Sequence, residues 1–437
     1  MGGPLEGIRA IVLTQAWAGS LSTELLALMG AEVVQIEARR RLDSWRGSYD
    51  GPVPAGLRTV PTAVHAWNCS PNFNAVNLSK QELTLDLQSE EGIELFRGLI
   101  PYADIMVENF SPRVVGNLGI DYEALTAIKS DLIMCSLSAY GADGPWRNIP
   151  GIGGTIEPTS GQSGLLGYVD GPPLNSGRMF PDGVAGTYGF AALVTALHYR
   201  NRTGCGQYID LSMQESNYGL IGDAVLEQAA TGNVRPRMGN RHLTFAPHGI
   251  YPALGQVVGQ VVGQVPGHAG GEEHWVALAA ESAQQWAALC AVAERPQWAS
   301  DTRFATNEAR KLHEDELDAE IAAWTAEQER DEAVAALQAA GVVAAPVLDG
   351  FEVAADPTFR ARGYVQDVDH PEAGVHAQFT APFRLSGTPL EPARAAPLMG
   401  EHSEEVLSRF LDIDHDDYER LVESGVTGKG PPPGYEG

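Results

Sequence analysis

The first half of the chain alternates between short apolar runs and amphipathic stretches. The apolar runs are rich in β-branched residues and predict strands at 8–13, 32–36, 83–87, 105–108 and 132–137. The amphipathic stretches between them predict helices at 21–28, 90–100 and 122–128. Strands and helices in this order form a parallel sheet with right-handed helical crossovers. The pattern therefore predicts an α/β fold whose first domain is Rossmann-like in shape.

The pattern changes from about residue 214 onward. Helices are predicted at 215–230, 275–292, 314–324 and 331–340. Between the first two lies a glycine-rich tract, in which a four-residue motif repeats from Gly255, Gly259 and Gly263. Three copies of four residues are too short for a solenoid, so this tract predicts a hairpin or a mobile loop. The last ten residues, 428–437, predict a disordered or surface-lying tail.

A single carboxylate stands before the helical pattern at 184–199. Asp182 lies there between Pro181 and Gly183, and a strand pattern follows at 208–213. In one interpretation Asp182 caps the helix, because its side chain can accept from an amide of the first turn. In the other, the helix amides keep it ionised and directed at a ligand, as a covalent nucleophile requires.

Composition and charge narrow the possible partners. The 437 residues suffice for two domains and carry a formal net charge of −27. Such an excess of acid argues against nucleic acid and anionic membrane surfaces as partners. No apolar run approaches transmembrane length, and the first residues lack a signal-peptide pattern. A cytoplasmic protein is therefore expected.

Common cofactor and metal motifs do not occur in the sequence. No G-x-G-x-x-G follows a predicted strand, and the stretch from Gly151 to Gly154 fails because Ile156 holds the third glycine position. A nicotinamide dehydrogenase is therefore disfavoured. The cysteines lack metal-ligand spacing, so we expect no metal site and reduced thiols. They are Cys69, Cys135, Cys205 and Cys290.

Basic residues gather after the second predicted strand. Arg39, Arg40 and Arg41 form a run, and Arg46 follows closely. They would lie at the carboxyl end of a strand, where open α/β sheets bind ligands. Two interpretations stay open, a phosphate-binding cluster or a solvated loop.

Seven short motifs occur in one order from residue 7 to residue 407. They span 7–19, 28–37, 107–113, 118–122, 136–146, 344–347 and 397–407. In these motifs the chain resembles class III CoA-transferases of the formyl-CoA transferase and carnitine CoA-transferase type, a family that also includes α-methylacyl-CoA racemase. Each motif alone is weak, but together they indicate the family far more firmly than the substrate.

The resemblance implies an architecture of two domains. Residues 1–215 would form a large Rossmann-like domain that carries the nucleophile, and residues 346–427 would return to it. Residues 216–345 would form a linker and a small domain that includes the glycine-rich loop 255–271. The tail at 428–437 would follow. Two chains of this family are expected to interlock as linked rings, which gives a homodimer.

The resemblance also implies a covalent mechanism on Asp182. Its carboxylate would attack an acyl-CoA thioester, and the released thiolate would convert the mixed anhydride to an aspartyl-CoA thioester. A small carboxylic acid would then accept CoA by the reverse steps. Gly183 and Gly186 would let the backbone approach the carboxylate. CoA is thus expected as a substrate, with no permanently bound cofactor.

Eleven positions match the family's CoA contacts. They are Gln15, Ala16, Ala18, Arg39, Arg40, Lys80, Asn109, Phe110, Arg113, Ala139 and Tyr140. The family's first-turn arginine falls at Ala38, so Arg39 or Arg40 is expected to replace it. Phe110 either stacks on adenine or belongs to the core.

Departures from the family bear on the reaction and the substrate. Ile152 stands where the racemase branch has its catalytic histidine, so an acyl-CoA racemase or isomerase is the disfavoured alternative. The formyl-CoA transferase subgroup has glutamine at Trp17 and an acid at Gly153, which here favours an acid larger or more apolar than formate or oxalate. A non-catalytic CoA-binding subunit of a heteromeric transferase is the other alternative.

Overall fold

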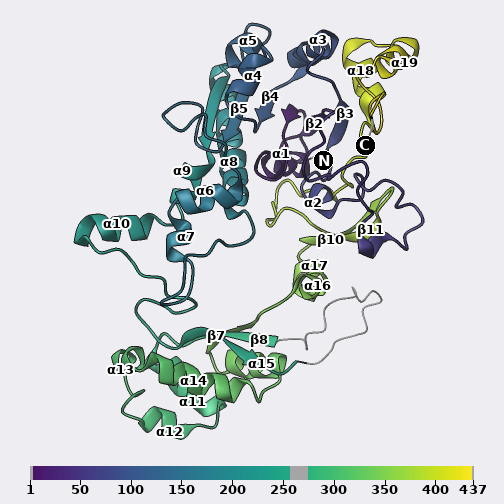
Figure 1. The fold of residues 1–437 in the computed structure, drawn as a ribbon. Coiled ribbons are helices and arrows are strands. Elements are labelled where there is room, and N and C mark those ends of the chain that lie inside the picture. The colour runs from purple at the N-terminus through teal and green to yellow at the C-terminus, as the bar shows by residue number, and fades with distance from the viewer. Residues whose placement is uncertain (1–2, 256–273, 436–437) are drawn as a thin grey trace. The chain divides into compact units, whose positions relative to one another are not determined.

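The computed structural model describes residues 3–255 and 274–435, and the chain divides into two compact units (Figure 1). The large unit comprises Met1–Ser163, Asn175–Asn233 and Asp356–Gly437. The small unit comprises Gly164–Leu174 and Val234–Ala355. Apart from Gly255, the glycine-rich loop predicted at 255–271 lies outside the described residues.

A six-stranded parallel sheet forms the centre of the large unit. Its strands are β1 (Arg9–Leu13), β2 (Glu32–Glu37), β3 (Gln81–Thr84), β4 (Ile105–Glu108), β5 (Ile133–Ser138) and β6 (Gln207–Ser212). They lie in the order β3-β2-β1-β4-β5-β6, which confirms the predicted parallel sheet. The chain runs outward from β1 through β2 and β3, and then outward on the other side from β4. The carboxyl ends of β1 and β4 therefore flank a topological switch point, where such sheets bind ligands.

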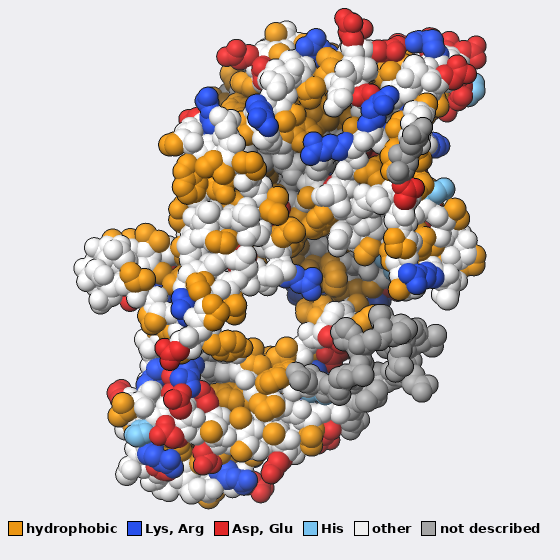
Figure 2. Space-filling view, in the orientation of Figure 1, with side chains coloured by type: hydrophobic (Ala, Val, Ile, Leu, Met, Phe, Trp, Pro, Cys, Tyr) orange, Lys and Arg blue, Asp and Glu red, His pale blue; other side chains and the backbone are white. Residues whose placement is uncertain are grey.

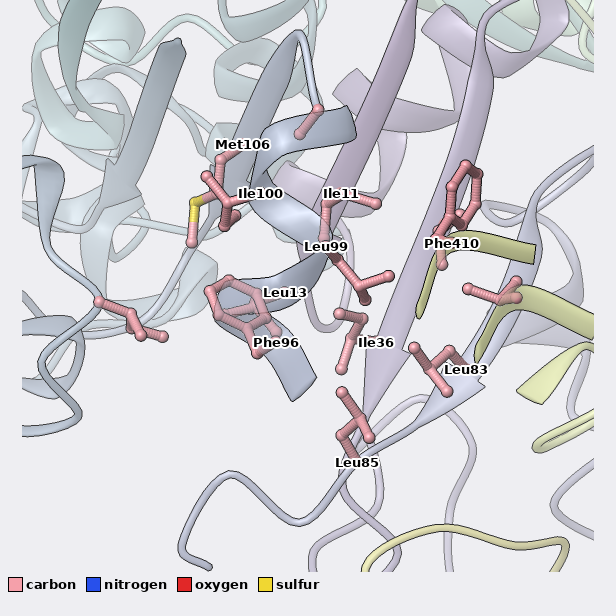
Figure 3. Packing of buried hydrophobic residues seen from close by; sticks show 14 of the residues in the cluster. Ile11, Leu13, Ile36, Leu83, Leu85, Phe96, Leu99, Ile100, Met106 and Phe410 are labelled. Atoms are coloured by element: carbon pink, nitrogen blue, oxygen red, sulfur yellow. The ribbon is translucent and has the colours of Figure 1, made fainter. Parts of the chain in front are cut away.

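Helices cover both faces of this sheet, because successive strand side chains point to opposite faces. On one face, Ile11 and Leu13 of β1 pack against Phe96 and Leu99 of α3, as Figure 3 shows. On the other face, a second apolar cluster joins the sheet to α1 and α8. Burying a large apolar side chain contributes roughly 1.5–3 kcal/mol to stability. The covering helices are α1 (Ala18–Leu28), α3 (Glu90–Leu99), α8 (Phe180–Thr203), α18 (Ser403–Leu411) and α19 (His415–Glu423).

The C-terminal segment returns to the β3 edge of the sheet. The backbone N–H of Thr84 donates to the Ser403 hydroxyl at 3.1 Å, and the Thr84 hydroxyl donates to the Gly428 carbonyl at 2.7 Å. The Tyr49 hydroxyl donates to the Gly430 carbonyl at 3.2 Å. The described part of the predicted tail therefore lies along the surface of the large unit.

The small unit contains a three-stranded antiparallel sheet in the order β7-β8-β9. Its strands are β7 (His248–Ala253), β8 (His274–Ala279) and β9 (Val343–Pro346), and the longer helices packed with them are α11 (Ala283–Val292), α14 (Glu314–Thr325) and α15 (Arg330–Ala339). Three tryptophans, Trp286, Trp298 and Trp324, fill much of its core.

Two predicted helices are wrong in part. The first five residues of 275–292 belong to strand β8, because Val276 and Leu278 are buried at a period of two. Helix α11 begins only after Ser282, which forms a capping box with Gln285. The predicted helix 215–230 is two helices, because two glycines at the break lower helix propensity.

The remaining helices and strands lie between these elements along the chain. They are α2 (Pro71–Asn74), α4 (Arg113–Asn117), α5 (Tyr122–Thr126), α6 (Gly153–Thr159), α7 (Gln162–Leu165), α9 (Met213–Tyr218), α10 (Gly222–Thr231), α12 (Pro296–Ser300), α13 (Asn307–Leu312), α16 (Gly350–Ala355), α17 (Pro357–Ala361), β10 (Val365–His370) and β11 (Gly374–Phe379). None of the described helices combines the length and the apolar character that spanning a bilayer requires.

Candidate active site

The loops that follow β1 and β4 are tied together at the switch point of the sheet. The backbone N–H of Gln15 donates to Oδ1 of Asn109 at 2.8 Å, and Nδ2 of Asn109 donates to the Gln15 carbonyl at 2.7 Å. One side-chain amide thus satisfies both backbone groups of one residue. This pairing fixes the two loops relative to each other at the edge where a ligand is expected.

Asp182 lies in the first turn of α8 and not before it. The helix begins at Phe180 with Pro181 second, a position that suits proline because its missing N–H has no helical partner there. Met179 precedes them in a left-handed conformation with φ 48°. The interpretation of Asp182 as the cap of a helix over 184–199 is therefore wrong, since Met179 holds the N-cap position. Pro181 is the sequence signal for the earlier start.

Three helices begin around the Asp182 carboxylate. They are α1 at Ala18, α6 at Gly153 and α8 at Phe180. Gly153 lies so close that a β-carbon there would overlap Oδ2 of Asp182. The backbone amides of Asp182 itself and of Ala18 lower the pKa of the carboxylate. Because free amides and the helix dipole favour negative charge, these helix starts stabilise the ionised form.

Burial acts against this stabilisation. Only 8% of Asp182 is exposed, and its Oδ2 has no hydrogen-bond partner among the described residues. Desolvation is the largest influence on the group and raises its pKa to about 6. Asp182 is thus mostly ionised near neutral pH, yet no residue of the described chain forms an ion pair with it and burial keeps bulk water away. A carboxylate in this state is suited to attack an electrophilic carbon.

An aromatic side chain packs on the backbone next to Asp182. At Gly183 an added β-carbon would lie 3.4 Å from the Trp17 indole, so the indole packs on the backbone next to Asp182. The Trp17 and Trp45 rings lie 5.8 Å apart and are tilted by 33°. The surroundings of Asp182 are therefore apolar on one side and closed by the Gly153 backbone on another.

Six of the predicted CoA positions lie along the carboxyl edge of the sheet. They are Gln15, Ala16 and Ala18 after β1, Asn109 after β4, and Ala139 and Tyr140 after β5. Ala139 and Tyr140 stand against Gly151, where an added β-carbon would lie 2.7 Å from that of Ala139. Gly151 leads directly into α6, so this pair shares its surroundings with Asp182.

Lys80 has a structural position instead. Its ammonium donates to the Ser20 carbonyl at 3.0 Å. It also donates to the Thr23 hydroxyl and to Oδ1 of Asn77, both at 2.8 Å. Burial lowers the pKa of Lys80 to about 7, although Glu24 opposes this. The three bonds use all of its hydrogens, which leaves no donor for a CoA phosphate.

The arginines that follow β2 differ in how deeply they are buried. Arg46 is fully buried and pairs with Glu37 at 2.6 Å and with Glu82, so its predicted part in a phosphate cluster is wrong. Arg39 is buried too, and its Nη1 donates to the Pro431 carbonyl at 3.5 Å. The run of arginines is therefore not one solvent-facing cluster.

The remaining predicted contacts are Arg40, Arg113 and Phe110. Arg40 is exposed and pairs with Asp86 at 3.1 Å. Arg113 is also exposed, as the first residue of α4. Phe110 is half-buried and packs against the apolar cluster under α3, as a core residue does. The two arginines are thus the members of the predicted set whose charge faces solvent.

Two buried carboxylates near Asp182 carry no sequence signal. Glu157 of α6 accepts from the Ser176 backbone N–H at 2.6 Å and from its hydroxyl at 2.7 Å, which anchors the segment before α8. Asp43 accepts from the Ala16 N–H at 2.9 Å. A single acid in a polar stretch looks like a surface residue, and only tertiary contacts distinguish it.

The cysteine thiols are neither paired in disulfides nor, among the described residues, grouped with other side chains that could hold a metal ion. All four cysteines are free, and Cys205 is the exposed one. Within residues 3–255 and 274–435, no group of His, Cys, Asp and Glu side chains is arranged to hold a metal ion.

Comparison with known proteins gives this arrangement a family context. The model of CoA-transferase family III matches residues 5–403. The chain is 32% identical over 423 residues to the succinyl-CoA–D-citramalate CoA-transferase of Chloroflexus aurantiacus, with 96% of each chain covered. It is 29% identical over 411 residues to the succinate–glutarate CoA-transferase of Agrobacterium fabrum, covering 94% of this chain and 96% of that one. A crystal structure of a CAIB/BAIF family protein from Brucella suis matches with a TM-score of 0.79 at 30% identity, covering 94% of this chain and 100% of the other.

Proposed function

We propose, from the premise that this chain belongs to CoA-transferase family III, that it moves CoA from an acyl-CoA to a carboxylic acid through a covalent intermediate on Asp182. CoA transfer itself follows from the family and the named relatives. The role of Asp182 is the proposal. The observation that carries it is a buried carboxylate that lies among helix N-termini and whose Oδ2 has no partner in the part of the chain that the structure describes.

The reaction uses the carboxyl group of Asp182 twice. An Asp182 oxygen attacks the thioester carbon of the donor, the C–S bond breaks, and CoA leaves as a thiolate. The thiolate attacks the Asp182 carboxyl carbon of the mixed anhydride, which releases the donor acid as a carboxylate and leaves an aspartyl-CoA thioester. The acceptor carboxylate then reverses these steps and restores Asp182. No net proton moves, so a site without a general base beside it is sufficient.

Each attack places negative charge on a carbonyl oxygen. Fixed backbone amides stabilise such charge better than water, because they need no reorientation during the reaction. The Ala18 amide already acts on the Asp182 carboxylate, so it is well placed for an oxyanion formed on that group. One donor of this kind contributes about 10²–10³-fold to the rate.

CoA would lie along the carboxyl edge of the sheet. The predicted contacts gathered there, from Gln15 to Tyr140, offer backbone and aromatic surface. Arg40 and Arg113 are the exposed cations that would meet its phosphates. Lys80 has no free donor, so we leave it out of the proposed contacts.

The Trp17 side chain next to Asp182 favours a substrate acid that is larger than formate or oxalate. The Trp17 indole packs on Gly183 beside the carboxylate, and it offers apolar surface rather than hydrogen bonds to a very small polar acid. The two relatives described above are named for succinyl-CoA, D-citramalate, succinate and glutarate, while others at 28–30% identity are named for formyl-CoA and oxalate. We therefore propose an acid with a carbon chain that contacts the Trp17 ring.

Helix α8 supports the proposal of a homodimer. Leu193 and Leu197 face the core of the large unit, whereas Tyr188 and Tyr199 are 52% and 46% exposed. Figure 2 shows hydrophobic side chains on the surface of the large unit, in the region where Figure 1 places α8 and α9. A helix that is apolar on two faces is usually covered on both. We propose that a second copy covers it, in the linked-ring arrangement expected of the family, and that the dimer works in the cytoplasm, where thiols stay reduced.

Replacement of Asp182 tests this proposal. Asp182→Asn and Asp182→Ala should each lower transfer between an acyl-CoA and an acid by more than about 1,000-fold, because the nucleophile is lost. CoA binding, measured by calorimetry, should persist. The control is Asp121→Asn, which alters a carboxylate at the start of α5 that accepts from the Ala124 N–H at 3.0 Å, and which should keep wild-type turnover. Residual transfer within tenfold of wild type in either Asp182 variant would rule out the covalent role.

A further inference from the structure

The loop after β1 contains a strained residue next to the site. Ala16 has φ 54°, in the left-handed region that residues with a β-carbon rarely adopt. Ala16 is followed by Trp17, the N-cap of α1, and by Ala18, the first residue of that helix. A different conformation at Ala16 would therefore change the direction of both. Such a conformation persists only when surrounding contacts hold it.

Asp43 supplies those contacts. The Ala16 N–H donates to both oxygens of the Asp43 carboxylate, at 2.9 and 3.0 Å. Oδ1 of Asp43 also accepts from the Trp45 N–H at 2.9 Å. The side chain is almost completely buried, so these bonds are shielded from water. One carboxylate thus ties the loop after β1 to the loop after β2.

The two loops carry the features that surround Asp182. The first provides the Ala18 amide, which lowers the pKa of the Asp182 carboxylate, and the Trp17 indole, which packs beside Gly183. The second provides the Trp45 ring, 5.8 Å from that of Trp17. Asp43 is hydrogen-bonded to both loops, so it links the segments that carry these three groups.

We propose that Asp43 is a positioning residue for the reaction at Asp182, because it holds Ala16 left-handed and thereby directs the Ala18 amide and the Trp17 indole at the nucleophile. This rests on the proposed function of Asp182. Both carboxylate oxygens are needed, since an amide in place of Asp43 would turn an NH₂ group against the Ala16 N–H. Of the charged groups, Glu37, Arg46 and Lys80 interact with Asp43. The pKa of Asp182 depends instead on burial and backbone amides.

A rescue experiment tests this role. Asp43→Asn should lower kcat by about 100-fold, because a displacement of about 1 Å at a reacting group has that effect. The KM for the acyl-CoA should change much less. Adding Ala16→Gly to the Asp43→Asn variant should raise kcat again by about tenfold, since glycine adopts positive φ without the β-carbon penalty. The Ala16→Gly variant alone provides the reference for that comparison.

The matched control is Asp104→Asn. Oδ2 of Asp104 accepts from the Arg9 N–H at 2.8 Å, at the opposite end of β1. This variant should lose stability without losing kcat. If Asp43→Asn is insoluble, Asp43→Ser is compared with and without Ala16→Gly. The near-ultraviolet circular dichroism of the Trp17–Trp45 pair is taken as the difference from a Trp17→Phe variant. This signal should change in Asp43→Asn and return to the wild-type value when Ala16→Gly is added.

The outcomes separate the two proposals. A wild-type kcat in Asp43→Asn, or a loss of kcat that Ala16→Gly does not relieve, overturns the role of Asp43. Unaltered transfer in Asp182→Asn overturns the covalent mechanism alone. In that case the circular dichroism decides whether Asp43 positions the loop, because that signal does not depend on turnover.

Discussion

Two sets of buried charge in the large unit differ in the number of their partners. Arg46 is fully buried and pairs with both Glu37 and Glu82. Its guanidinium also donates to the Pro397 carbonyl at 3.2 Å. Asp182 is nearly as well buried, yet its Oδ2 has no partner among the described residues. Burying a charge without a partner is unfavourable, so a fold keeps such a group mainly where its reactivity is used.

The basic residues that the sequence suggests as CoA or phosphate contacts differ in the same way, by the number of their partners. Lys80 has three acceptors for three hydrogens, and Arg46 has two carboxylates. Arg113 is exposed and forms no hydrogen bond or ion pair with any residue in the described part of the chain. All three are basic residues, so their charge alone does not distinguish them. The number of satisfied donors is what separates a structural charge from a candidate binding group.

Removal of Arg46 should have the largest effect on stability. Arg46→Met would leave Glu37 and Glu82 buried without a counter-charge and should lower the free energy of unfolding by about 3–5 kcal/mol. Urea denaturation at pH 7.5 measures this. The control is Arg9→Met, since Arg9 pairs with Glu32 at a partly exposed site, where the loss should stay below about 1 kcal/mol. Equal losses in the two variants would contradict the structural role of Arg46.

Much of the fold was predictable from the sequence because buried parallel strands leave a local signal. The runs at 8–13 and 105–108 are β-branched and apolar, and both are strands of the observed sheet. Strand β8 was misassigned as helix, because only Ala280, Glu281 and Ser282 separate it from α11, so one helical pattern was taken to cover both. The start of α8 was set too late, although Pro181 indicates it.

The site was less predictable because its contacts join distant parts of the chain. Asp182 was identified through the family resemblance, whereas its missing partner on Oδ2 is a property of packing. Arg46 looked like a phosphate ligand because its partner Glu82 comes from another strand. Asp43 was not identified at all, since its bond to Ala16 crosses between two loops. No local pattern encodes these pairings.

Asp182→Asn should stabilise the protein at pH 7.5, on the order of 2 kcal/mol, because it removes an unpaired buried charge. The folded pKa of Asp182, about 6, lies above that of an unfolded aspartate, so ionisation disfavours the folded wild type. The wild type therefore loses stability as pH rises from about 4 through 6, and the amide variant does not lose this contribution. Chemical denaturation at pH 5 and pH 7.5 measures the difference in the free energy of unfolding between Asp182→Asn and the wild type, which should be larger at pH 7.5. A difference that is the same at both pH values, or larger at pH 5, would contradict the raised pKa of Asp182.

The covalent role of Asp182 is tested most directly by the intact mass of the protein during turnover. Wild-type protein is incubated with acyl-CoA thioesters, succinyl-CoA among them, without an acceptor acid. The account predicts a mass gain equal to CoA less one water, and borohydride reduction should convert Asp182, and no other acid, to the alcohol. Asp182→Asn should show no gain, while Asp121→Asn should behave as wild type. A CoA adduct on another residue, or turnover of a thioester with no adduct at Asp182, would contradict the mechanism.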